Sequence, residues 1–254
     1  MKMHFGVMTA LITPLLNDGI TLNEKAYVEI IEDQIKNGVH SLLTMGGTGE
    51  SLTLPRETKK RAMELAVKTV NHRVPVIASV VELSVYDAIE SAKVVKESGA
   101  DVLLLSNPYG GNTRLSGVID FFKMVDDAVD MPMIIYNFPG RTGYNVTPDI
   151  VGKLLDAVPN ICGIKECAER FEQTMELIGH FGDRMAVLSG NEFLGAWEML
   201  CGADGCVVAT GNVMIKELVK LYDIAKSGDI AKTTEYGLSL FPMMRSLFKS
   251  PNPG

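Results

Sequence analysis

Residues 98–105, with the sequence SGADVLLL, join the end of a predicted helix directly to a predicted strand. Gly99 stands where a helix commonly ends in a left-handed residue. The run Val102–Leu105 is apolar at every position, which is typical of a parallel strand buried on both faces. Similar helix ends at Asn37-Gly38-Val39 and Cys201-Gly202-Ala203-Asp204 indicate a repeated unit of strand and helix.

Short apolar runs alternate with longer amphipathic stretches along the whole chain. Eight such runs in 254 residues match the strand number and usual size of one β/α barrel. An open doubly wound sheet is the alternative, but the chain contains neither a dinucleotide-binding glycine fingerprint nor a P-loop. We therefore predict an α/β fold, a (β/α)8 TIM barrel over residues 1–225. Residues 226–254 are predicted to form the start of a C-terminal helical extension. The predicted strands are Gly6–Leu11, Ser41–Met45, Val76–Val80, Val102–Leu105, Met133–Tyr136, Ile161–Lys165, Met185–Leu188 and Cys206–Ala209.

Three helix starts carry capping signals. Thr21-x-x-Glu24 and Ser84-x-x-Asp87 fit the capping box, in which a hydroxyl and an acid satisfy free N–H groups of the first turn. Thr147-Pro148 supplies a capping residue followed by proline, whose missing N–H costs nothing at the first helical position.

Composition narrows the class of protein. Hydrophobic residues make up 46% of the chain, charged residues 22%, and the net charge is −7. An acidic chain is a poor partner for nucleic acid or an anionic membrane surface. No apolar run reaches the roughly 18 residues of a membrane span, and the N-terminus lacks a signal-peptide pattern. We therefore expect a cytoplasmic protein that binds a small molecule, neither nucleic acid nor a membrane.

The four cysteines form two equal C-x4-C pairs, Cys162 with Cys167 and Cys201 with Cys206. A zinc site is one interpretation, but two of the thiols lie inside apolar runs. Free cysteine commonly behaves as a small buried hydrophobe. We expect no metal and no disulfide here.

In a β/α barrel the chemistry lies at the carboxyl ends of the strands. Lys165 ends a predicted strand, and period-two alternation places it on one face with Gly163 and Ile161. Burial among apolar groups favours the uncharged amine, the form that attacks a carbonyl. The alternative is a lysine that extends to solvent or pairs with Glu166. Tyr136 ends the preceding strand, where a phenol is placed to move protons; the alternative is a core tyrosine.

Two further loops at this end carry candidate anion-binding groups. Gly46-Gly47-Thr48-Gly49 presents backbone N–H groups and one hydroxyl, which suit a carboxylate; the alternative is a plain tight turn. Arg141 could hold a second carboxylate by two parallel hydrogen bonds, the alternative being an exposed loop arginine.

Three motifs in this order resemble those of the dihydrodipicolinate synthase and N-acetylneuraminate lyase family of class I, Schiff-base aldolases. They are Gly46-Gly47-Thr48-Gly49-Glu50-Ser51, Tyr136-Asn137-Phe138-Pro139-Gly140-Arg141-Thr142-Gly143 and Gly163-Ile164-Lys165-Glu166. The likeness runs from about Gly6 to the end of the chain.

The resemblance implies a lyase in which Lys165 forms a Schiff base with pyruvate or a related 2-oxo acid. It assigns proton transfer to Tyr136. Gly47 and Thr48 would bind the 2-oxo acid carboxylate, the carbonyl of Val207 would line the site, and Arg141 would meet the second substrate. It also implies no metal or organic cofactor and a homo-oligomer, either a dimer or a tetramer.

Departures from the family pattern leave the exact substrate open. Gly47 stands where the synthase branch usually has a relay threonine, and Gly110, after Tyr109, stands at the position of a relay tyrosine. Relatives usually continue beyond Gly254 with further helices, so the extension is expected to be truncated.

These departures favour a Schiff-base lyase acting on pyruvate or another 2-oxo acid, such as a deoxy sugar acid, by aldol chemistry or dehydration. Arg141 supports the alternative, a synthase that condenses pyruvate with aspartate semialdehyde in lysine biosynthesis. A second alternative is a non-catalytic barrel that binds a 2-oxo acid. A phosphate-binding barrel is a further one, through Ser189-Gly190-Asn191 and Thr210-Gly211-Asn212.

Overall fold

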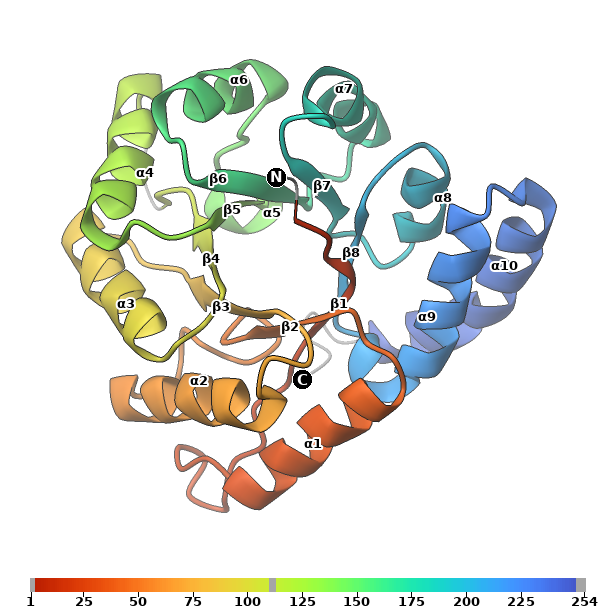
Figure 1. The fold of residues 1–254 in the computed structure, drawn as a ribbon, viewed down its shortest axis with the longest axis horizontal. Helices are drawn as coiled ribbons and strands as arrows, with labels where there is room; N and C mark the ends of the chain where they lie inside the picture. Colours follow the sequence, from red (N-terminus) through yellow and green to blue (C-terminus); the bar gives the residue numbers. More distant parts are fainter. Residues whose placement is uncertain (1–2, 110–112, 250–254) are drawn as a thin grey trace.

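The computed structural model describes residues 3–109 and 113–249, and in them eight parallel strands close into a barrel in chain order (Figure 1). The strands are β1 Gly6–Ala10, β2 Ser41–Thr44, β3 Val76–Val80, β4 Val102–Ser106, β5 Met133–Asn137, β6 Ile161–Glu166, β7 Ala186–Ser189 and β8 Gly205–Val208. Every strand predicted from the sequence is present, within about one residue at each end. The predicted TIM barrel is therefore confirmed.

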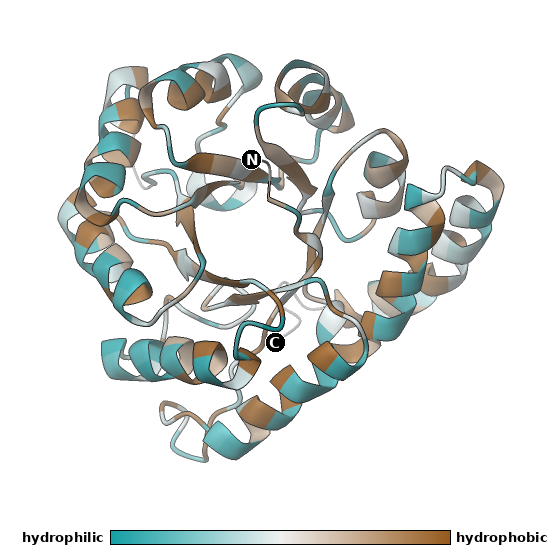
Figure 2. Ribbon diagram, in the orientation of Figure 1, coloured by the Kyte–Doolittle hydropathy of each residue, from teal (hydrophilic) through white to brown (hydrophobic). Residues whose placement is uncertain are grey.

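Helices surround the barrel, with their apolar sides toward the strands and their hydrophilic sides outward (Figure 2). The described helices are α1 Glu24–Lys36, α2 Arg56–Val70, α3 Val85–Glu97, α4 Leu115–Val129, α5 Pro139–Thr142, α6 Pro148–Ala157, α7 Phe171–Phe181, α8 Gly195–Leu200, α9 Gly211–Lys226 and α10 Ile230–Leu247. No helix in the described ranges is both long enough and apolar enough to cross a membrane.

Two separate apolar cores follow from the pleat of the strands. In β4, Leu104 packs inside the barrel, whereas Leu103 and Leu105 pack between the barrel and the helices. Side chains such as Phe5 and Met8 fill the interior, so the barrel is a packed core rather than a pore. This explains why each strand is apolar on both faces.

One helix cap differs from its prediction. α1 is capped by Asn23, whose side chain accepts a hydrogen bond from Ala26 N at 3.2 Å. Thr21 instead donates to Asp18 in the preceding turn, at 2.5 Å. The capping box at Thr21 is therefore wrong, because a turn closed by Asp18 already uses the threonine. Ser84 caps α3 as predicted, accepting from Tyr86 N at 3.1 Å.

A bulge at Cys162 changes the face of the residue before it. Met133 pairs with Ile161, but Ile134 pairs with Gly163, so Cys162 has no opposite residue on β5. Ile161 consequently packs in the outer core, and the prediction that it shares a face with Lys165 is wrong. Beyond the bulge the alternation is regular.

The last helix lies outside the ring. α10 packs against α8 and α9 rather than against the strands (Figure 1). The predicted division between a barrel ending at residue 225 and an extension over 226–254 stays a prediction.

Candidate active site

Lys165 and Tyr136 lie side by side at the carboxyl end of the barrel. They are register partners on β6 and β5, and both side chains face inward. Lys165 Nζ is 4.7 Å from the centroid of the Tyr136 ring. Tyr136 is buried and Lys165 is half-buried, so the amine lies against the aromatic ring at the floor of an open cavity.

The environment keeps the Tyr136 phenol protonated. Burial holds its pKa well above the usual value, Cys167 adds to this effect, and the Arg141 guanidinium opposes it. Removing a phenol from water disfavours the charged phenolate. At neutral pH, Tyr136 is therefore available as a proton donor next to the lysine amine.

One cavity of about 250 Å³ collects the predicted site residues. Gly47 and Thr48 enter it from the loop after β2, Arg141 from α5, and Val207 from β8. All six residues that the sequence singled out therefore line or flank one space. Their roles in binding and catalysis stay predictions.

Arg141 occupies the space that a side chain at position 47 would need. A methyl group built on Gly47 would overlap Nη1 of Arg141. The guanidinium Cζ also lies 5.1 Å from the centroid of the Phe138 ring, which supports its other side. Arg141 is an exposed residue, and the absence of a side chain at Gly47 lets its guanidinium reach into the cavity.

Glu192 is a cavity residue that the sequence did not single out. Its carboxylate accepts hydrogen bonds from Thr210 Oγ1 at 2.6 Å and from the N–H group of Ala209. Burial raises the pKa of Glu192, while these bonds and the charge of Lys165 oppose the rise. The only sequence signal was its place just beyond a strand end, a position shared by many polar loop residues.

Three phenylalanines, Phe193, Phe241 and Phe248, pack together beside the same cavity, and two of them line it. Phe193 packs on Phe241 at 5.1 Å and on Phe248 at 5.9 Å between ring centroids. Phe193 and Phe248 line the cavity, so the end of α10 reaches the site although the helix lies outside the ring. Sequence spacing could not reveal this long-range approach.

Cys167 also borders the cavity, directly after the strand that carries Lys165. Burial raises the pKa of its thiol to about 12, although Lys165 opposes the rise. The thiol therefore stays protonated, which makes it a weak nucleophile. All four cysteines are free, and the described residues contain no cluster of acidic, histidine or cysteine side chains suited to a metal.

The two asparagine loops proposed for phosphate are used internally. Asn191 Oδ1 accepts from Phe193 N at 2.9 Å. Asn212 Oδ1 accepts from Ile12 N at 3.1 Å, and its amide donates to Ala10 O at 2.7 Å. These bonds close loops, which weakens the phosphate alternative.

Tyr109 lines a smaller pocket that adjoins the cavity and shares Gly47, Tyr136 and Arg141 with it. Gly110, at the predicted relay position, lies outside the described residues.

Comparison with known proteins extends the likeness to the whole chain. The model of the dihydrodipicolinate synthetase family matches residues 3–254. The chain is 36% identical to a 4-hydroxy-tetrahydrodipicolinate synthase of Desulfotalea psychrophila, covering 100% of this chain and 84% of the relative. It is 38% identical to the enzyme of that name from Geotalea uraniireducens, over 99% and 86% of the two chains.

A solved structure is similar to this chain over nearly its whole length. The dihydrodipicolinate synthase of Acinetobacter baumannii, determined in complex with pyruvate, superposes with a TM-score of 0.94 at 32% identity. The match covers 99% of this chain and 86% of that one.

Proposed function

This chain belongs to the dihydrodipicolinate synthetase family and is a lyase, and from that premise we propose that it is a 4-hydroxy-tetrahydrodipicolinate synthase. The proposed reaction condenses pyruvate with aspartate semialdehyde. The observation that carries the proposal is the Lys165 amine set 4.7 Å from the Tyr136 ring, in a cavity shared with Thr48 and Arg141. The relatives favour this narrower function over the broader 2-oxo acid lyase.

The first stage joins pyruvate to the protein. Lys165 Nζ attacks C2 of pyruvate, and the resulting carbinolamine loses water to leave a C=N bond between Nζ and C2. The departing hydroxyl needs a proton, which the protonated phenol of Tyr136 is placed to supply. Thr48 and the N–H groups near Gly47 are suited to hold the pyruvate carboxylate.

The second stage forms the new carbon–carbon bond. The protonated imine withdraws electrons, so C3 loses a proton and the imine becomes an enamine. C3 then bonds to the aldehyde carbon of the second substrate, whose oxygen takes a proton and becomes a hydroxyl group. The amino group of that substrate finally displaces Lys165 from C2, which closes a six-membered ring and frees the lysine. Arg141 is suited to bind the carboxylate of the second substrate by two hydrogen bonds.

Borohydride trapping tests the proposal. The protein is incubated with pyruvate, reduced, and mapped by peptide mass spectrometry, and turnover with aspartate semialdehyde is measured in parallel. The expected result is a pyruvyl adduct on Lys165 together with formation of the cyclic product. An adduct without product from any aldehyde would favour the non-catalytic binding barrel. A folded protein that forms no adduct with pyruvate would overturn the proposal.

A second candidate is aldol cleavage or dehydration of a deoxy sugar acid through the same imine. Gly47 favours it, because position 47 provides no relay hydroxyl and Arg141 fills the space instead. Under this candidate, a longer 2-oxo sugar acid labels Lys165 and is turned over, while aspartate semialdehyde is not consumed.

Gly47→Ala is expected to displace Arg141 while leaving the fold intact. The added methyl overlaps the far end of a flexible side chain, which can swing toward solvent at little cost. The displaced Arg141 would lose its charged hydrogen bonds to the carboxylate of aspartate semialdehyde, which are worth about 1.5–3 kcal/mol. This loss should raise KM for aspartate semialdehyde about tenfold or more. Steady-state kinetics and thermal unfolding measure both effects.

Gly179→Ala in α7 is the matched control, since nothing lies within 4 Å of its added methyl. It should leave KM unchanged. An unchanged KM in Gly47→Ala as well would mean that Arg141 does not bind the second substrate from this position.

The expected cytoplasmic location and the expected dimer or tetramer stay predictions.

A further inference from the structure

Glu166 lies directly behind the reacting lysine. It follows Lys165 on β6 and pairs in register with Asn137 on β5, just as Lys165 pairs with Tyr136. Successive side chains on a strand point to opposite faces. The inner pair therefore faces the cavity, and the outer pair lies between the strands and the helices.

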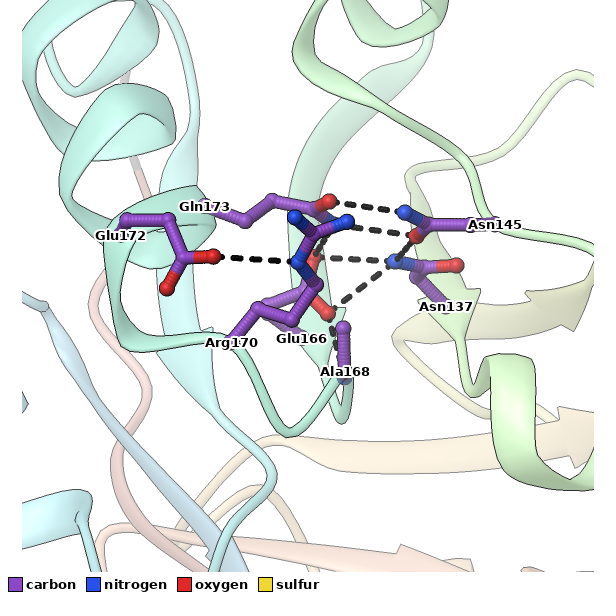
Figure 3. A network of polar contacts seen from close by, with 7 residues as sticks. All are labelled: Asn137, Asn145, Glu166, Ala168, Arg170, Glu172 and Gln173. Carbon is purple, nitrogen blue, oxygen red and sulfur yellow. Dashed lines mark hydrogen bonds and ion pairs between the residues drawn. The ribbon is translucent and has the colours of Figure 1, made fainter.

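The Glu166 carboxylate is buried and held by nitrogen donors (Figure 3). Asn137 Nδ2 lies 3.0 Å from both oxygens. Ala168 N donates to Oε1 at 2.6 Å, and Gln173 Nε2 donates to Oε2 at 2.9 Å. Burial raises the pKa of Glu166, and Glu198 adds to the rise, but the hydrogen bonds to Asn137, Ala168 and Gln173 oppose it. Burying a carboxyl group costs free energy unless hydrogen bonds replace those it made to water, and these donors provide them.

The network fixes which way each amide points. Asn137 Oδ1 accepts from Val146 N at 2.9 Å, so its amino group must face Glu166. Ala168 offers a backbone N–H group, which cannot be reversed. Position 166 therefore needs an acceptor at both oxygens, a requirement that a carboxylate meets and a glutamine amide does not.

The same network ties together the loops that follow the two strands. Asn145, from the segment after α5, accepts from Asn137 Nδ2 at 2.9 Å and donates to Gln173 Oε1 at 2.8 Å (Figure 3). Gln173 lies in the first turn of α7. Two backbone bonds add to this connection, from Cys167 N to Asn137 O at 2.8 Å and from Gly190 N to Glu166 O at 2.7 Å.

We propose that Glu166 is a positioning residue, which acts through Asn137 to hold the ends of β5 and β6 so that Lys165 and Tyr136 stay aligned for imine formation and proton transfer. The inference rests on the proposed function. A small displacement of a reacting pair is expensive: about 1 Å can lower a rate about a hundredfold. The reacting pair lies one residue from the network on both strands.

Glu166→Gln tests this role while keeping the size of the side chain. It places an amino group against donors from Asn137, Ala168 or Gln173. We expect kcat and the rate of borohydride-trapped adduct formation to fall about ten- to a hundredfold, with KM for pyruvate changed less than about threefold. Both rates are measured well below the melting temperature, where a merely destabilised protein is still folded and would keep the wild-type kcat.

Glu198→Gln is the matched control, because Glu198 is an equally buried carboxyl group on α8. Glu198 accepts from Thr174 Oγ1 at 2.9 Å and makes no hydrogen bond to β5 or β6 among the bonds of the described residues. It should keep the wild-type kcat. An equal loss of kcat in both variants, or a wild-type kcat in Glu166→Gln, would overturn the inference.

Gln173→Met provides a second route if Glu166→Gln does not fold. It removes one donor from α7 without changing either strand, and we expect a smaller fall in kcat of about threefold to tenfold. A wild-type kcat in this variant, with Glu166→Gln unfolded, would overturn the inference. Wild-type protein that forms no adduct with pyruvate would instead mean that the proposed function has failed.

Discussion

Lys165→Met is expected to abolish turnover, with kcat at least about ten-thousandfold below wild type, as for other covalent nucleophiles. Methionine keeps an unbranched chain of similar length but has no amine, so no imine can form. Lys165 is half-buried, and among the described residues the one aromatic ring that its Nζ lies over is that of Tyr136. The fold should therefore tolerate the change. Turnover, borohydride trapping and thermal unfolding measure the three expectations.

The matched control is Lys153→Met on α6, an exposed lysine outside the cavity. It should keep both turnover and the pyruvyl adduct on Lys165. If Lys165→Met still produced a trapped adduct at another lysine and retained turnover, the nucleophile would have been assigned wrongly.

The barrel could be predicted from sequence because a parallel strand covered on both faces has a distinctive composition. Val102–Leu105 is apolar at every position, as Leu104 enters the inner core and Leu103 the outer one. Lys165 and Tyr136 stood out for the same reason, since each places a reactive group at the end of an apolar run. Short-range patterns therefore located both the strands and the two residues that lie side by side in the cavity.

What the sequence missed depends on contacts between distant residues. The bulge at Cys162 is set by pairing with β5, and period-two alternation alone cannot detect it. Phe248 reaches the cavity only because α10 folds back over α8 and α9.

Glu166 shows the same difficulty in the site itself. In the sequence, an ion pair between Glu166 and Lys165 is one alternative to a catalytic role for the lysine. The structure instead places the two side chains on opposite faces of β6. The Glu166 carboxylate accepts hydrogen bonds from Asn137 on β5, Gln173 on α7 and the backbone N–H group of Ala168.

Tyr136→Phe should lower kcat by about a hundred- to ten-thousandfold, the usual range for losing a positioned general acid or base. Phenylalanine fills the same volume, and the aromatic ring beneath Lys165 Nζ is kept. Only the hydroxyl group is removed. Since burial keeps the pKa of this phenol above its usual value, Tyr136 stays protonated through the neutral range and its ionisation should not set the alkaline limit of activity there.

The adduct separates this effect from that of Lys165→Met. In Tyr136→Phe the amine remains, so borohydride should still trap pyruvate on Lys165, but more slowly because loss of water from the carbinolamine lacks its donor. Tyr144→Phe, in the segment after α5, is the control with the same atom removed away from the cavity, and it should keep its kcat. A kcat for Tyr136→Phe within about twofold of wild type would show that another group carries the proton. In that case the ring of Tyr136 serves to shape the floor of the cavity. The proton donor would then be another group that lines the cavity, and Glu192 is a candidate because burial raises its pKa.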